Sequence, residues 1–308
     1  MNKETLNCEL ITPMFSSGMD TKKAELRASE LKALMRYVYR ISNQTLDTQK
    51  LYEEEARLFG DAEKHASPIR LQLVAGELKT ERKLLLLHPK AGHKPISECY
   101  PEKGTYSIVL RKFLNKGEGM SFYRNLILLS FILGGMGKRS RRGRGCSAVV
   151  NAGESAPDLT REALLPWMTE QLNLLNATSA SPAYVLEKDI IRFHPNRYEN
   201  WSRYNRPVIE KIRLGKPINN VNKFLLEVDL ASHKIKLSPP KNNLFATGYA
   251  YKGSKFASSL LISVTRTSKG ELLPVYTFVK AVVDRNTPLD KDHTERNEMI
   301  SFIEGGTF

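Results

Sequence analysis

Hydrophobic and polar positions change period several times along the first half of the chain. A spacing of three and four residues predicts an amphipathic helix over residues 27–41, and its apolar face comprises Leu31, Leu34, Met35, Val38 and Ile41. Short apolar or alternating runs predict strands at residues 8–12, 69–75, 106–110 and 146–150. Residues 121–133 are apolar nearly all round, which predicts a second, well-buried helix.

The predicted order of these elements is strand, helix, strand, strand, helix, strand. This is the βαββαβ arrangement of ferredoxin-like folds. RNA-recognition domains share that topology, although a fold alone does not assign a function. A charged stretch over residues 52–65, between the first helix and the second strand, is interpreted as a solvated helix or an insertion.

The second half shows a related pattern. Residues 161–175 are predicted to form a helix capped by residues 158–160, and strands are predicted at residues 224–230, 256–265 and 275–283. We therefore expect an α+β protein with two tandem ferredoxin-like (RRM-like, βαββαβ) domains, the second divergent. The predicted domains are residues 1–150 and 158–308, joined by a small, polar linker at residues 151–157.

The charge of the chain favours a polyanionic partner. Lys and Arg number 47 against 33 Asp and Glu among 308 residues, a formal net charge of +14. Nucleic acid is the first candidate partner and plain solubility the alternative. The three cysteines, Cys8, Cys99 and Cys146, lie too far apart for a zinc motif or a disulfide scaffold, so a reducing cytoplasm is expected. We expect neither a secretory signal nor a membrane span.

The positive charge is concentrated in a loop, residues 135–145, which reads G-M-G-K-R-S-R-R-G-R-G. Glycines permit close approach of a ligand to the backbone, and arginines pair with phosphate oxygens two at a time. The glycines are Gly135, Gly137, Gly143 and Gly145, and the basic residues are Lys138, Arg139, Arg141, Arg142 and Arg144. A clamp for a nucleic-acid backbone fits this composition, and a disordered basic turn is the alternative.

Two nucleotide-binding motifs do not fit the loop. A P-loop requires a hydroxyl residue where Arg139 stands and a first glycine where Ile132 stands. A dinucleotide fingerprint requires a third glycine where Ser140 stands. The sequence thus predicts neither ATP nor NAD as a cofactor.

Two further groups of residues are candidate RNA contacts. Lys32, Arg36 and Arg40 recur every four residues and would line one face of the first helix, where a solvated face is the alternative. Arginines and aromatics interleave between residues 192 and 206, which suits phosphate pairing with base stacking. The candidates there are Arg197, Trp201 and Tyr204, and the alternative is that the large aromatics are core or interface anchors.

The sequence holds little that would support catalysis. Its six histidines form no H-x-x-x-H pair, and the acidic residues Asp290, Asp292 and Glu295 are interpreted as a solvated tail, so no metal site is predicted. His194 lies in a basic, aromatic setting and is the candidate general acid–base if the protein cleaves RNA without metal.

The glycine-rich loop resembles the signature of the RAMP superfamily of CRISPR proteins, which is Gly, a hydrophobic residue, Gly, five residues with Lys or Arg, then Gly-x-Gly. Residues 135–145 fill every place of that signature. The segments I-T-P-M-F at 11–15, E-L-R-A-S at 25–29, K-A-L-M-R at 32–36 and A-R-L-F-G at 56–60, with Ser67-Pro68, are similar to the first subunit of the Cmr (type III-B) effector complex.

This resemblance implies two ferredoxin-like folds and a place in an RNA-guided complex of antiviral defence. The implied role is a non-catalytic, RNA-binding subunit that contacts the guide RNA near its 3′ end and neighbouring RAMP subunits. Single-stranded target RNA is a further candidate partner. The alternative is a metal-independent RAMP endoribonuclease that processes CRISPR precursor RNA. A protein-interaction module whose loop docks an acidic partner is a third hypothesis.

Overall fold

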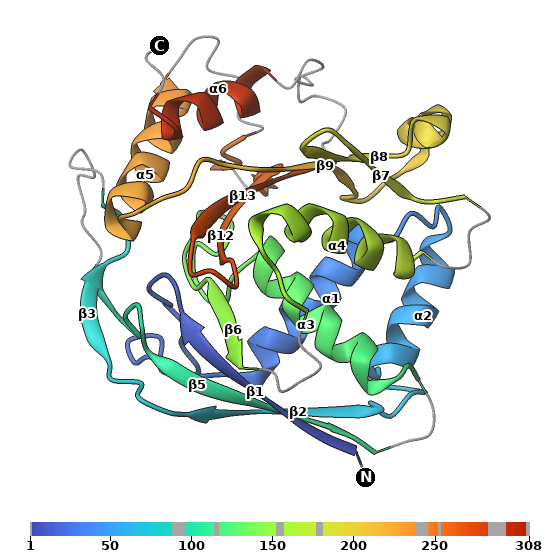
Figure 1. The fold of residues 1–308 in the computed structure, drawn as a ribbon, viewed down its shortest axis with the longest axis horizontal. Helices are drawn as coiled ribbons and strands as arrows, with labels where there is room; N and C mark the ends of the chain where they lie inside the picture. Colours follow the sequence, from blue (N-terminus) through green and yellow to red (C-terminus); the bar gives the residue numbers. More distant parts are fainter. Residues whose placement is uncertain are drawn as a thin grey trace.

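The computed structural model describes residues 2–87, 96–113, 117–151, 157–176, 181–237, 246–251, 254–282 and 294–305. It is a mixed α+β structure with two principal antiparallel sheets and helices between and over them (Figure 1). In the described ranges, none of the helices has the length and apolar character that crossing a bilayer would require.

The first half follows the predicted succession of strands and helices. Its elements are β1 (Asn2–Leu10), α1 (Ala28–Ser42), β2 (Ile69–Ala75), β5 (Thr105–Lys112), α3 (Met120–Leu133) and β6 (Ser147–Asn151). The strands pair in the order β2-β5-β1-β6, and each neighbouring pair is antiparallel. Alternation along β1 turns Leu6, Cys8 and Leu10 toward the helices, because successive side chains point to opposite faces of a sheet.

Two insertions interrupt this pattern. The charged stretch forms part of α2 (Thr48–Phe59), which Asp47 caps by accepting the backbone N–H groups of Gln49 and Lys50. The second insertion is the hairpin β3 (Glu81–Leu84) and β4 (Ile96–Cys99). Rather than being wholly solvated, α2 buries one face that includes Glu55 and Phe59.

The second half is built on a five-stranded sheet of order β12-β13-β9-β8-β7. Its helices and strands are α4 (Arg161–Leu174), β7 (Tyr184–Glu187), β8 (Ile190–Phe193), the 3-10 helix η2 (Pro195–Arg203), β9 (Ile209–Leu214), α5 (Val221–Leu237), β10 (Tyr249–Tyr251), β11 (Ser254–Phe256), β12 (Leu260–Arg266), β13 (Leu272–Val279) and α6 (Thr294–Ile303). The predicted helix cap is confirmed at Thr160, whose hydroxyl accepts the N–H of Ala163.

One predicted strand in this half is wrong. Residues 224–230 lie inside helix α5, where Phe224, Leu225 and Val228 share the buried face. The seven-residue apolar window could not distinguish a strand from a buried helix, because its periodicity is visible only over a longer stretch. The elements β9, α5, β12, β13 and α6 follow the order strand, helix, strand, strand, helix, and no strand follows α6 in the described residues. A second complete βαββαβ domain is therefore not confirmed.

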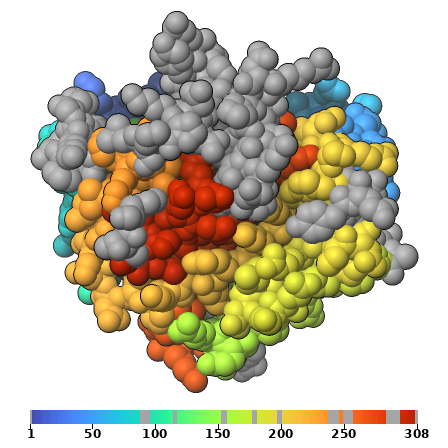
Figure 2. All heavy atoms as spheres, turned by 90° about the horizontal axis from the view of Figure 1, so that it is seen from above, coloured from blue at the N-terminus to red at the C-terminus, as the bar shows by residue number. Residues whose placement is uncertain are grey.

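The two halves share one main hydrophobic core. It joins Leu6 and Phe131 of the first half to Leu164, Ile212 and Val275 of the second. Helix α3 packs against β12 and β13 as well as its own sheet, which accounts for its being apolar nearly all round. Seen from above, elements of the second half cover most of the coloured surface (Figure 2). The two-domain division stays a prediction, and most of the proposed linker lies outside the described residues.

Candidate nucleic-acid interface

The glycine-rich loop connects α3 to β6 and is bonded to protein on both of its sides. The backbone N–H of Lys138 donates to the carbonyl of Phe15 at 2.8 Å, and that of Gly145 donates to Pro13 at 2.9 Å. On the other side, Gly143 donates to Ile262 of β12 at 2.8 Å. The loop is thus packed between the segment that follows β1 and the sheet of the second half.

The glycines serve this internal packing. Gly137 has φ +86°, and a Cβ there would lie 2.6 Å from the carbonyl oxygen of Phe15. Gly145 has φ +68°, and its Cβ would lie 1.8 Å from the carbonyl oxygen of Met136. Gly135 and Gly143 are buried in the same seam. The close backbone approach expected for a ligand is made, at these positions, by the protein itself.

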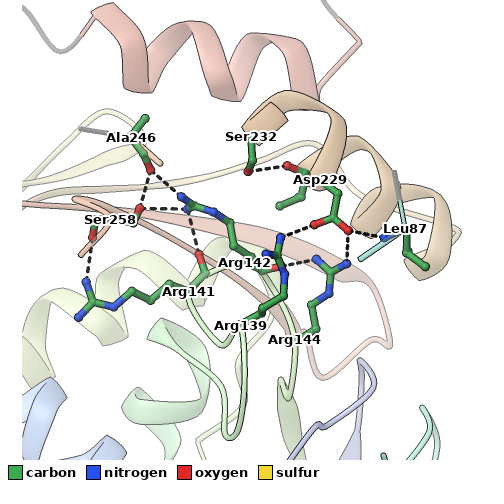
Figure 3. Close-up of polar contacts among 10 residues, drawn as sticks. Leu87, Arg139, Arg141, Arg142, Arg144, Asp229, Ser232, Ala246 and Ser258 are labelled. Carbon is green, nitrogen blue, oxygen red and sulfur yellow. Dashed lines mark hydrogen bonds and ion pairs between the residues drawn. The ribbon is translucent and has the colours of Figure 1, made fainter. Parts of the chain in front are cut away.

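Two of the four loop arginines converge on one carboxylate of the second half, Asp229 of α5 (Figure 3). Arg139 Nη2 lies 2.5 Å from Asp229 Oδ1, and Arg144 Nη2 lies 2.6 Å from Oδ2. The backbone N–H of Leu87, beyond β3, donates to the same Oδ2 at 2.8 Å. Asp229 therefore ties the loop, α5 and the β3 insertion together.

Arg142 is buried without a carboxylate partner among the described residues. Its Nη2 donates to the carbonyl of Ala246 at 2.8 Å, and its Nη1 donates to Ser258 Oγ at 3.0 Å (Figure 3). Burial, and then the neighbouring charges of Arg139 and Arg141, lower the pKa of Arg142 to about 9. The guanidinium consequently stays charged at neutral pH, with neutral acceptors around it.

These contacts correct part of the predicted phosphate clamp. Arg142 and Arg144 are 7% and 1% exposed, and both guanidiniums donate to groups of the protein. Among the residues that the structure describes, they act as docking residues between the halves. Lys138 is exposed, and Arg139 and Arg141 are partly exposed, so these three are the loop cations that solvent reaches.

A cavity of about 500 Å³ lies between the loop and α1. Its apolar lining includes Leu34, and the charged residues Glu30, Lys138 and Arg141 also line it. The Arg141 guanidinium lies 5.0 Å from the centre of the Tyr37 ring, and the Tyr37 hydroxyl is buried without a hydrogen-bond partner in the described part of the chain. An apolar cavity with cationic residues in its lining suits a nucleotide, because a base and a phosphate require those two environments.

The predicted basic stripe of α1 is present, and α2 partly neutralises it. Arg36 Nε lies 2.5 Å and Arg40 Nη1 3.3 Å from Glu55 Oε1, and the Glu55 side chain is 4% exposed. Lys32 Nζ donates to Ser67 Oγ at 3.1 Å, and burial, followed by the charge of Arg36, lowers its pKa. The Arg40 side chain remains 48% exposed, so it is the member of the stripe most open to solvent.

The aromatic candidates of the second half form a small core. Tyr204 is 5% exposed, and its hydroxyl donates to the carbonyl of Gln44 at 2.6 Å. The rings of Trp201 and Phe193 meet edge to face, with centroids 5.0 Å apart. The burial of Tyr204 favours the anchor interpretation for this residue, and contact of Tyr204 with RNA stays a prediction. Arg197 lies in η2, and its side chain is outside the described residues.

The candidate acid–base residue has a local structural contact. His194 precedes η2, and its Nδ1 accepts the backbone N–H of Asn196 at 3.2 Å. Asp290 and Asp292 lie outside the described residues, and Glu295 is buried at the start of α6 rather than solvated. Within the described ranges, no group of three His, Cys, Asp or Glu side chains could hold a metal ion.

The sequence reasoning missed the two acidic residues that organise these basic groups. The local pattern places Asp229 in a predicted strand, and Glu55 in a stretch interpreted as solvated. Both are single acidic residues among apolar neighbours on the buried face of a helix, and that pattern was the available signal for them.

Comparison with known proteins supports the fold. No protein-family model matches the sequence, and no curated protein matches it. The crystal structure of apo Cmr1 from Pyrococcus furiosus is 17% identical, with a TM-score of 0.58 over 98% of this chain and 96% of that chain. A chain of the type III-B Cmr-beta complex bound to cognate target RNA is 13% identical, with a TM-score of 0.57 over 98% of this chain and 99% of that one.

A second Cmr-beta structure, bound to cognate target RNA and AMPPnP in the presence of ssDNA, contains a chain 12% identical with a TM-score of 0.59. That match covers 97% of this chain and 98% of the other. At these identities the likeness is one of fold. The predicted resemblance to the first Cmr subunit is confirmed at that level and along the whole chain.

Proposed function

We propose that this protein is an RNA-binding subunit of a type III-B CRISPR (Cmr) effector complex. It contacts the guide RNA near its 3′ end and contributes binding rather than cleavage. The full-length likeness in fold to Cmr1 and to chains of RNA-bound Cmr-beta complexes supports this assignment. The site residues of this chain supply the physical argument.

The observation that carries the proposal is an excess of positive charge at the loop. Five basic residues lie between Gly137 and Gly145, and Asp229 is the one carboxylate that forms ion pairs with them in the described part of the molecule. Gathering like charges at a half-buried seam is costly unless an anion compensates for them. RNA phosphates are such anions, and binding them releases condensed counterions.

The cavity beside α1 indicates the path that the RNA would take from the loop. Lys138 and Arg141 line its loop side, and Arg40 is exposed farther along the same helix. An RNA strand that runs along α1 would place a base in the apolar cavity and the phosphates of the RNA on these cations. Contacts of this kind fix the position of RNA without reading its sequence.

The test is the salt dependence of RNA binding by the full chain. Removing one phosphate-binding cation should lower the slope of log affinity against log salt by about 0.7 on single-stranded RNA. We expect a Lys138→Gln, Arg141→Gln double variant to lower the slope by about 1.4, equally for unrelated RNA sequences. An unchanged slope would overturn the proposal.

The matched control removes the same charge elsewhere. Lys3 of β1 and Lys112 of β5 are close together on neighbouring strands, because Lys112 pairs with Asn2, the residue before Lys3. Seven strand residues place Lys3 about 23 Å from Leu10, whose partner Ser147 begins β6 just after the loop. A Lys3→Gln, Lys112→Gln variant should keep the wild-type slope.

The absence of cleavage is tested separately. Repeat RNA incubated with the protein in EDTA should stay intact. Clean cleavage that His194→Ala abolishes would instead establish the metal-independent ribonuclease.

A further inference from the structure

The loop has two basic flanks, and the second one faces α5. On the first flank, Arg141 lies over Tyr37 of α1. On the second, Arg139 reaches Asp229 of α5, while its Nε is buried and has no hydrogen-bond partner in the described part of the chain. The Arg139 side chain is 26% exposed, so it borders solvent on this flank.

The charge on the α5 flank is not balanced by the described residues. Arg139 and Arg144 share the single negative charge of Asp229, and the buried Arg142 donates to neutral oxygens. Three positive charges therefore meet one negative charge. A structure that keeps this imbalance is suited to receive an anion from outside.

Lys236 completes this group from the last turn of α5. It lies seven residues after Asp229, which places both on one side of the helix. The side chain is exposed and forms no ion pair with any described residue. Burial, and then the charges of Arg142 and Arg139, lower the pKa of the Lys236 ammonium.

A favourable interaction with the helix C-terminus is the simpler explanation for a lysine here. Lys234 in the same turn fits that explanation, and its ammonium lies over the ring of Phe302 at 4.4 Å. The helix terminus does not explain why Lys236 lies on the side of α5 that carries Asp229, the carboxylate bound by Arg139 and Arg144. An anion between Lys236 and these arginines would offset the repulsion among the cations.

We infer that Arg139 and Lys236 form a binding site for one phosphate of the RNA backbone, on the α5 side of the loop. The site rests on the proposed function and extends it, because the strand would continue from the α1 cavity across the loop onto the second half. It contacts phosphate alone, so it adds affinity without base preference.

The experiment compares Lys236→Gln with Lys234→Gln in the full chain, using homopolymer single-stranded RNAs. Both variants remove one charge from the same helix turn, so any effect of net charge or of the helix terminus is common to them. At about 0.1 M salt, Lys236→Gln should weaken binding about fivefold and lower the salt slope by about 0.7. Lys236→Arg should restore both quantities, and Lys234→Gln should leave the slope unchanged.

Three outcomes would overturn the inference. A wild-type slope for Lys236→Gln refutes the site, while the loop variant Lys138→Gln, Arg141→Gln still tests the proposed function independently. Equal losses for Lys234→Gln and Lys236→Gln would show a general charge effect. A loss that differs between homopolymers would show base contact instead of phosphate contact.

Discussion

Replacing Asp229 by Asn tests whether the loop arginines hold the two halves together. The substitution keeps the shape of the side chain and removes its charge. The Asp229 side chain is fully buried and that of Arg144 is 1% exposed, so water cannot replace the lost partner. Leaving a buried charge without its counterion costs about 3–5 kcal/mol, and we expect a loss of unfolding free energy in this range.

Urea titration, followed by circular dichroism and tryptophan fluorescence, measures the change. The two tryptophans, Trp167 and Trp201, both belong to the second half, so their fluorescence follows the unfolding of that half. The control is Asp189→Asn, since Asp189 is exposed and its substitution should change stability by less than about 0.5 kcal/mol.

Two arginine variants separate burial from charge. Arg144→Met removes the buried member of the cluster, and Arg139→Met removes the partly exposed one, with the same carboxylate facing both. We expect the Arg144 variant to be the more destabilised, because the ion pair that it loses is more deeply buried than the ion pair of Arg139. An Asp229→Asn protein within about 1 kcal/mol of wild type would refute the docking role of the cluster.

Three other predictions test the loop, the thiols and the aromatic core. Gly145→Ala should severely impair folding because its Cβ would overlap a carbonyl oxygen, whereas Gly270→Ala, also at positive φ but with nothing within 4 Å, should cost only about 1–2 kcal/mol; thermal unfolding compares them. Burial raises the pKa of Cys146 to about 11, so the native thiol should stay protonated at pH 8 and resist a thiol reagent that modifies it rapidly in urea; rapid native reaction would contradict this. Tyr204→Phe should cost about 1–3 kcal/mol by leaving a buried carbonyl without its donor, with RNA affinity unchanged; weaker RNA binding at full stability would show that the hydroxyl contacts RNA.

Local patterns predicted the order of the main elements in the first half, although β1 spans Asn2–Leu10 instead of residues 8–12 and the β3–β4 hairpin was not predicted. Helix α1 and strand β2 were found at or within a residue of their bounds, because each has a clear period and one apolar face. Prediction was poorer in the second half. The helical face of α5 was mistaken for a strand, since its buried side chains are recognised only once α6 and β12 are seen to cover them.

The sequence by itself determined that this protein has a glycine-rich basic loop, between an apolar helix and a strand, and that its charge favours a polyanion. It could not determine which cations face that polyanion. Only the tertiary structure assigned Arg142 and Arg144 to the seam and left Lys138, Arg139 and Arg141 open to solvent. The reason is that a guanidinium binds a carboxylate, a carbonyl or a phosphate through the same N–H groups. Its role is therefore decided by which acceptor lies nearby, and Asp229, 85 residues from Arg144, is brought there by the fold alone.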